Sequence, residues 1–358
     1  MKFLKHVFLI TLLSFLTFSC GRNDVDSSTT NEDLAQKQNE TENRITPVSE
    51  LNSGIRIDGA LSKTGTPPSP TGNLNFQIST EKQEAFQEYG FNIKFSTTDE
   101  IAGAYILFQD TDGNLLDNYL DVPLSALESG KSSNTKTPMV SKKSSKKQNL
   151  LTGDDYIVDV DFDSILPGNF CYDICLYDAN GNISVIQNVC VEVEAWGGNF
   201  EIIGEWIYDS SNDDNTYTED ISCANGDTVT ANFNDDEETW TLVLNANGSY
   251  YETYIGIENV IDYEATLNSC TLISSKENYE DKYLGNWAYN EDKETFTIID
   301  FRYENILDAS EIENYPDGSV YFNGIDTTAK IISDNLVIIE TYSEFNETYT
   351  NTYTFKRK

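Results

Sequence analysis

Histidine is almost absent from this chain, whose 358 residues include one, His6. It lies within residues 1–19, which have the charge and hydropathy pattern of a secretory signal, so we expect the mature protein to contain none. A chain without histidine excludes Ser-His-Asp and Cys-His catalysis, histidine-ligated zinc or haem, and a histidine pH switch. Carboxylate chemistry, tyrosine chemistry and cations bound by oxygen atoms stay open.

Basic residues are also scarce. The sequence holds 23 lysines and arginines against 60 aspartates and glutamates, a formal charge of −37. Removing residues 1–19, which contain two lysines and no acids, would make the charge −39. Such a chain repels phosphate backbones and anionic membrane surfaces, so we expect no nucleic-acid partner. We interpret the acids as a solvated surface that keeps a secreted protein soluble; the alternative is a surface that binds cations.

The N-terminal segment predicts where the protein is located. Lys2 and Lys5 supply positive charge, and an apolar run of about a dozen residues follows, too short to span a bilayer as a stable helix. A resemblance to bacterial lipoprotein cleavage sites is carried by Leu16-Thr17-Phe18-Ser19-Cys20. It implies a signal peptide over 1–19, acylation of Cys20, and a protein lipid-anchored to the outer membrane, on its periplasmic or its outer face. The alternative is an ordinary secretory signal in which the cysteine is incidental.

Patterns typical of helices are few. The chain contains 2 methionines but 21 tyrosines and 18 phenylalanines, and apolar residues alternate with polar ones between Asn-Gly and Asp-Gly turns. This is typical of an all-β protein, and the length indicates two domains. Residues 20–52 contain almost no large apolar side chains, so we expect a flexible tether there. The two domains are predicted over 53–197 and 198–358.

About seven short strands predict a β-sandwich for the first domain. Its late segment, Cys171-Tyr172 followed by Asp178-Ala179-Asn180-Gly181-Asn182, resembles the last hairpin of immunoglobulin-like and fibronectin type III-like modules. That resemblance implies an immunoglobulin-like architecture. Residues 129–149 are rich in lysine, serine and threonine, and we expect a disordered loop. The alternative is a loop that contacts lipid headgroups or the acidic surface of the second domain.

The same hairpin predicts a disulfide. If Asn180-Gly181 is a two-residue turn, Cys171 faces Cys190, and we expect a partly exposed bridge between them in an oxidising compartment. The register also places a set of apolar residues in the core: Tyr172, Ile174, Leu176, Val185, Val189 and Val191. Cys223 and Cys270 are predicted to form a second bridge, which stabilises by about 4 kcal/mol in the chain-entropy treatment. Cys175 remains as a structural free thiol; the alternative is a cross-domain bridge that uses it.

Successive hairpins over 198–358 predict an up-and-down meander that closes into a barrel. A resemblance to the lipocalin-like domains of bacterial lipoproteins is carried by Gly204-Glu205-Trp206, the turn at 245–250, Gly285-Asn286-Trp287 and the final Phe-Lys-Arg-Lys. It implies that Trp206 plugs the barrel floor, and we expect Trp240 and Trp287 in the core. Gly204, Trp206, Gly285 and Trp287 are thus structural residues. Several tyrosines could line a sugar or lipid site or serve as cross-strand packing residues: Tyr250, Tyr251, Tyr254, Tyr342, Tyr349 and Tyr353.

Candidate chemical motifs are weak. Asp110-x-Asp112-x-Asn114 alternates oxygen ligands as in a calcium loop, but Gly113 breaks the register, so a hairpin turn is preferred. The acidic segments 209–214 and 235–238 are interpreted as solvated loops. A carboxylate pair could support glycoside hydrolysis, but with 60 acids such a pair will occur by chance. We predict no catalytic residue, no metal site and no cofactor.

The sequence therefore predicts a non-enzymatic, monomeric cell-envelope lipoprotein held at the membrane by its N-terminal lipid anchor. In the first hypothesis, the barrel binds a small apolar or amphipathic ligand. In the second, the two domains serve adhesion or scaffolding by binding envelope proteins or glycans. The third is a carboxylate-dependent glycosidase. An open apolar cavity would favour the first, a filled barrel with an exposed aromatic patch the second, and two close carboxylates in a cleft the third.

Overall fold

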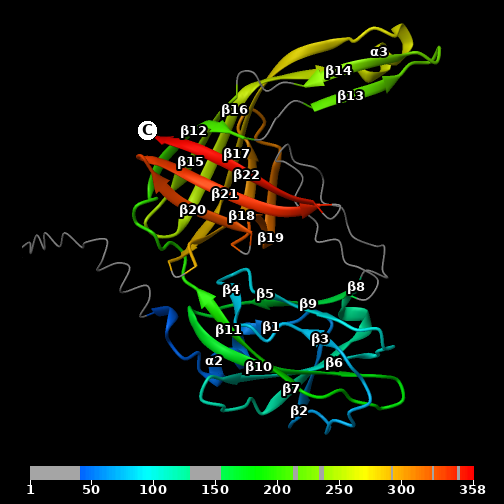
Figure 1. The fold of residues 1–358 in the computed structure, drawn as a ribbon, viewed down its shortest axis with the longest axis vertical. Coiled ribbons are helices and arrows are strands. Elements are labelled where there is room, and N and C mark those ends of the chain that lie inside the picture. Colours follow the sequence, from blue (N-terminus) through cyan, green and yellow to red (C-terminus); the bar gives the residue numbers. More distant parts are fainter. Residues whose placement is uncertain are drawn as a thin grey trace, which may run out of the picture.

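Strands form both domains of the protein (Figure 1). The computed structural model describes residues 41–129, 155–212, 217–233, 238–291, 293–324, 326–344 and 347–358. The all-β prediction is confirmed, and the second domain is a closed antiparallel barrel, also as predicted. The predicted signal peptide, Cys20, and most of the lysine-rich loop lie outside the described residues.

Two sheets build the first domain. The larger has the strand order β2-β7-β6-β10-β11-β4, and the smaller has the order β1-β9-β5-β3 with β8 beside β9. All pairs are antiparallel except β11 with β4. The strands are β1 (Ile55–Arg56), β2 (Leu61–Thr64), β3 (Gln77–Ile78), β4 (Gln83–Phe86), β5 (Phe91–Ser96), β6 (Gly103–Asp110), β7 (Asn118–Pro123), β8 (Glu128–Ser129), β9 (Asp155–Phe162), β10 (Gly168–Tyr177) and β11 (Gln187–Glu194), with a short 3₁₀ turn, η1, at Leu124–Ala126.

Alternation along these strands forms a core between the two sheets. In β5, Phe91, Ile93 and Phe95 are buried, and the intervening Lys94 is exposed. Because strand side chains alternate between faces, each sheet turns its apolar side toward the other. The core joins residues of β5 and β9 to residues of β6, β10 and β11.

One predicted core residue, Val185, is instead 52% exposed. The β10–β11 pairing has the predicted register from Gly168↔Val193 to Ile174↔Gln187, but nearer the turn Tyr177 pairs with Ile183, one residue out of that register. The extra residue forms a bulge that turns Val185 outward, while Ser184 is buried and accepts a hydrogen bond from the Leu176 N–H at 2.8 Å.

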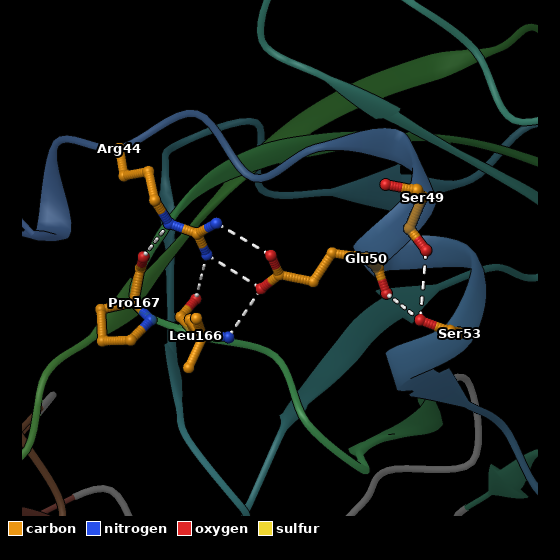
Figure 2. Close-up of polar contacts among 6 residues, drawn as sticks. All are labelled: Arg44, Ser49, Glu50, Ser53, Leu166 and Pro167. Carbon is orange, nitrogen blue, oxygen red and sulfur yellow. Dashed lines mark hydrogen bonds and ion pairs between the residues drawn. The ribbon is translucent and has the colours of Figure 1, made fainter.

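Residues 41–52, which we expected in the flexible tether, instead fold onto the first domain. Helix α2 (Val48–Gly54) buries Leu51 in the core, where it is 1% exposed. The Arg44 guanidinium donates two hydrogen bonds to the Glu50 carboxylate, at 2.8 and 2.9 Å (Figure 2).

The same pair is joined to the β9–β10 connection. Arg44 donates to the carbonyl oxygens of Pro167 and Leu166 at 3.0 and 3.1 Å, and the Glu50 carboxylate accepts from the Leu166 N–H at 2.8 Å (Figure 2). Composition alone did not predict this docking, because it depends on the burial of one leucine and on an ion pair that meets residues more than 100 positions away. Together, these contacts offset the entropy of ordering the segment.

Eight strands close the barrel of the second domain. Its order around the wall is β17-β16-β15-β12-β22-β21-β20-β18, with β18 pairing back to β17. The first strand pairs with the last, Trp206 opposite Arg357, as closure requires. The strands are β12 (Gly204–Ser211), β15 (Thr239–Leu244), β16 (Ser249–Ile261), β17 (Ser274–Asn290), β18 (Thr295–Asn305), β20 (Thr327–Ile332), β21 (Asn335–Glu344) and β22 (Glu347–Arg357), with β19 (Ile312–Phe322) as an added strand beside β18.

Local turn chemistry explains this meander. Ser333 and Asp334, between β20 and β21, have φ values of 51° and 67°, the positive angles that a two-residue hairpin turn needs. The turn between β15 and β16 instead closes with a hydrogen bond from the Gly248 N–H to the Asn245 carbonyl oxygen at 3.0 Å. Because these turns are short, strands that follow one another in the sequence pair with each other in the barrel wall.

A projecting arm was not predicted. It comprises the hairpin β13 (Tyr217–Ser222) and β14 (Thr228–Phe233), helix α3 (Tyr263–Ser269), and the parts of β16 and β17 over 256–279. Figure 1 shows the arm extending from the barrel on the side away from the first domain. β15 reaches only to Ile255 on β16, so beyond it the β16–β17 hairpin has left the barrel wall.

Candidate functional site

The barrel interior is filled by side chains. Trp206 is fully buried, and its indole N–H donates to the carbonyl oxygen of Ile202 at 2.7 Å. The Arg357 guanidinium carbon lies 4.3 Å from the centre of a Trp206 ring, a cation–π contact between the first and last strands. A β-carbon at Gly204 would lie 2.8 Å from an Arg357 nitrogen, so the glycine gives the arginine room to cover the tryptophan.

Trp287 and Gly285 occupy the facing wall. Trp287 is fully buried, donates its indole N–H to the Asn245 carbonyl oxygen at 3.0 Å, and packs near Phe296. Gly285 lies at a register shift between β17 and β18, where a β-carbon would lie 1.9 Å from the Ile299 carbonyl oxygen. Only glycine allows the two strands to approach this closely.

Trp240 occupies the interior between two tyrosines. Its ring stacks on Tyr208 at 5.4 Å and on Tyr254 at 5.3 Å, and Phe355 meets it edge-on at 4.7 Å. The Trp240 indole N–H donates to the Glu252 carboxylate at 2.9 Å, and the Tyr254 hydroxyl donates to the same oxygen at 3.2 Å. Trp240 therefore fills the space in which a ligand of a hollow barrel would lie.

Five of the six tyrosines singled out in the sequence divide into two groups; the sixth, Tyr251, has its ring centre 4.8 Å from the Lys282 ammonium. Tyr250, Tyr254 and Tyr353 belong to the packed interior, and burial raises the pKa of the Tyr254 hydroxyl well above its usual value, with Glu252 nearby adding to the effect. Tyr342 and Tyr349 stack on each other across β21 and β22, with ring centres 5.4 Å apart and Tyr349 exposed. Cross-strand packing accounts for both groups.

The Asp110 motif forms a hairpin turn. One Asp110 oxygen accepts the backbone N–H groups of Asp112 and Asn114 at 3.0 and 2.9 Å, and the other accepts the Asn114 side-chain amide at 2.7 Å. These donors hold the pKa of the Asp110 carboxyl below its usual value. Among the described residues, no group of three or more His, Cys, Asp or Glu side chains could hold a metal ion. The acidic segments 209–214 and 235–238 lie partly outside the described residues.

Both predicted disulfides are present, Cys171–Cys190 in the first domain and Cys223–Cys270 in the second. The first joins paired residues of β10 and β11. Cys175 is free and 1% exposed, and burial, with Asp173 nearby, raises the pKa of its thiol to about 11. A buried thiol of this pKa is inert rather than reactive.

The second disulfide staples the arm at its tip. Cys270 ends α3, and Cys223 begins the turn between β13 and β14. The Ala224 N–H donates to the Leu267 carbonyl oxygen at 3.2 Å, and the Tyr263 hydroxyl donates to the Glu219 carboxylate at 2.8 Å. Two isolated hairpins would be marginally stable in water, so the staple supplies order that the arm's small interior cannot.

The tip of the arm exposes apolar side chains. Of the eighteen large hydrophobic residues exposed in the described chain, five lie within residues 260–273. We call these five the tip patch: Val260 (36% exposed), Tyr263 (46%), Leu267 (38%), Leu272 (39%) and Ile273 (40%). Tyr263 and Leu267 are four residues apart on α3 and so share one face of the helix. The Ile273 carbonyl oxygen accepts the Asp262 N–H at 2.9 Å, which holds the chain after α3 against the start of the helix.

Acidic residues surround the tip patch. Residues 217–233 and 256–279 contain seven acids and one base, Lys276. Asp262 and Glu264 flank Tyr263, and Asp262 also caps α3 by accepting the Ala265 N–H at 2.9 Å. The tip therefore presents aliphatic side chains on a rigid, negatively charged support.

Comparison with models of known protein families, with curated proteins and with solved structures finds no match for this chain. No helix among the described residues is long and apolar enough to cross a bilayer. The candidate site therefore depends on the geometry of the arm alone. Sequence reasoning missed the arm, although the predicted Cys223–Cys270 bridge and the apolar pair Leu272-Ile273 next to it were signals that could have indicated it.

Proposed function

We propose that this chain is a non-enzymatic binding protein of the cell envelope, anchored through Cys20, that binds a protein partner through the tip patch. The observation that carries the proposal is the gathering of exposed apolar side chains on a disulfide-stapled arm that extends from a filled barrel. Exposed apolar groups that are held in place without burial are typical of interaction surfaces. The prediction of a small ligand in the barrel stays untested, and the packed interior gives it no support.

The chemistry of the patch favours one kind of partner. Four of its five residues are aliphatic, whereas glycan sites rely on exposed aromatic faces. Its acidic surroundings repel anionic lipid surfaces and nucleic acids. A protein surface with an apolar hollow surrounded by lysine and arginine complements both the aliphatic side chains of the tip patch and the acidic residues around them. Because the arm is stapled before binding, little ordering entropy opposes association.

The test is photo-crosslinking of the whole chain in its native envelope. A photoreactive amino acid replaces Asn268, an exposed residue next to Leu267 of the tip patch. We expect one dominant protein adduct, whose crosslinked peptide contains basic residues, and competition by unlabelled chain. The triple variant Leu267→Ser, Leu272→Ser, Ile273→Ser should lower the purified partner's affinity at least about tenfold, since hot-spot residues contribute 1–2 kcal/mol or more.

The matched control removes the same number of exposed apolar side chains from the first domain. Leu61, Leu115 and Val185 are 55%, 44% and 52% exposed, and their replacement by serine should leave crosslinking and affinity unchanged. If the tip variant binds as well as the control, the proposed function is wrong. Circular dichroism checks that the tip variant is folded, and mass spectrometry checks that its Cys223–Cys270 bridge is intact.

A further inference from the structure

The two domains meet in a buried contact. Trp196, just after β11, stacks on Phe86 at the end of β4 with ring centres 5.9 Å apart. Gly197 then pairs with the barrel strand β17: its N–H donates to the Trp287 carbonyl oxygen at 2.7 Å, and its own carbonyl oxygen accepts the Tyr289 N–H at 2.8 Å. The connection therefore lies against the barrel wall, and the domain orientation depends on side chains at this junction.

A buried carboxyl group lies at the centre of that junction. Glu194, the last residue of β11, is 3% exposed, and its side chain accepts a hydrogen bond from the Asn290 amide of the barrel at 2.9 Å. Side chains of both domains surround it, among them Glu84 and Phe86 of the first domain and Ala288, Asn290, Thr295 and Thr297 of the barrel.

The charged groups around Glu194 come from every element packed there. Glu42 approaches from the N-terminal segment, Glu84 from β4 and Glu192 from β11 itself. Two lysines are present: Lys293 of the barrel pairs with Glu84, and Lys82 pairs with Glu192 at 2.8 Å. Three carboxylates therefore lie near Glu194; both lysines form ion pairs with other acids, and Lys293 also interacts electrostatically with Glu194.

Burial raises the pKa of the Glu194 carboxyl to about 8, and the neighbouring Glu42 carboxylate raises it further than the Asn290 hydrogen bond lowers it. An ionised carboxylate buried among like charges is unfavourable, whereas a neutral carboxyl group is compatible with the contact.

We propose that the junction is a proton-controlled latch, in which neutral Glu194 holds the two domains in this contact and its ionisation releases them. Separating the domains would return water to the Glu194 carboxyl, whereas Glu42, Glu84 and Glu192 all belong to the first domain and stay beside it, so its pKa would fall below the docked value of about 8 but remain above the ordinary 4.5. Docking therefore binds the proton more tightly, and it weakens as the pH rises through the interval between these two pKa values, up to about 8. A single proton changes the docking equilibrium by at most about tenfold per pH unit in that window.

The test measures the distance between the domains in the whole chain, solubilised in detergent. Spin labels are carried by non-natural amino acids at the exposed positions Asp112 and Asp334, which leaves both disulfides intact. Pulsed electron resonance should give one narrow distance distribution at pH 6. A second, broader population should grow as the pH approaches 9. Glu194→Gln should keep the narrow distribution throughout, because its side chain cannot ionise.

Two further variants separate Glu194 from its neighbours. Glu42→Gln removes a carboxylate that raises the pKa of Glu194, so the release should begin at lower pH than in the wild type. A release that disappears in Glu42→Gln and persists in Glu194→Gln would assign the titration to Glu42 and overturn the latch. Glu192→Gln, on the same strand, should retain most of the wild-type transition. An unchanged wild-type distribution from pH 5.5 to 9.5, or an equal transition in Glu194→Gln, would overturn the proposal. Neither result bears on partner binding by the tip patch.

Discussion

Replacement of Trp240 tests whether the barrel is filled or hollow. The indole stacks between Tyr208 and Tyr254 and donates its N–H to Glu252, which is fully buried. Truncating a buried tryptophan to alanine costs 3–5 kcal/mol, and loss of the donor to a buried acceptor adds 1–3 kcal/mol. We therefore expect Trp240→Ala to lower the free energy of unfolding by about 5 kcal/mol. Trp240→Phe, which keeps most of the ring volume, should cost about 2 kcal/mol.

Guanidinium unfolding, followed by fluorescence and circular dichroism, measures both changes. Tyr349→Ala provides the control on the outer wall: Tyr349 is 39% exposed and should contribute less than about 1 kcal/mol. A cavity of indole shape also predicts that millimolar indole will stabilise Trp240→Ala and leave the wild type unchanged. A cost below about 1 kcal/mol for Trp240→Ala would refute the packing argument and restore the hollow-barrel hypothesis.

Three further predictions concern the remaining structure. Replacing Cys223 and Cys270 together by serine should speed amide hydrogen exchange in the arm, because the local free energy of unfolding falls by up to about 4 kcal/mol. The barrel strands should keep their protection, and an equal loss of protection there would contradict a separate arm. Arg44→Met should destabilise the first domain by about 1–3 kcal/mol in thermal unfolding, because it leaves the Glu50 carboxylate half-buried without its guanidinium partner; an unchanged melting temperature would show that the N-terminal segment is not docked. Cys175 should resist alkylation at pH 8 until the protein unfolds, since its thiol pKa is raised to about 11, and rapid labelling of the folded chain would contradict its burial.

Local patterns in the sequence were enough for much of the architecture. The alternation of Phe91, Ile93 and Phe95 indicated a strand with one buried face, which depends only on the two-residue period of a strand. Cys171 faces Cys190 as predicted, but the two-residue turn was wrong: Asp178 pairs with Asn182 across a loop of three residues, and the bulge between Ile183 and Gln187 restores the predicted register. The bulge that exposes Val185 shows the limit of this reasoning, because one added residue reverses the faces beyond it.

The sequence by itself determined that this is an all-β chain and that no histidine chemistry operates beyond residue 6, and it favoured the two cysteine pairs that the structure contains over a cross-domain bridge through Cys175. Only the tertiary structure decided that the barrel is filled, that an arm extends from it, and that Glu194 is buried between domains. Each of these depends on contacts between residues far apart in the chain, such as Trp240 with Phe355 and Glu194 with Asn290. Such contacts leave no periodic trace in the sequence, because the burial of a side chain is set by whichever distant residues the fold brings to it.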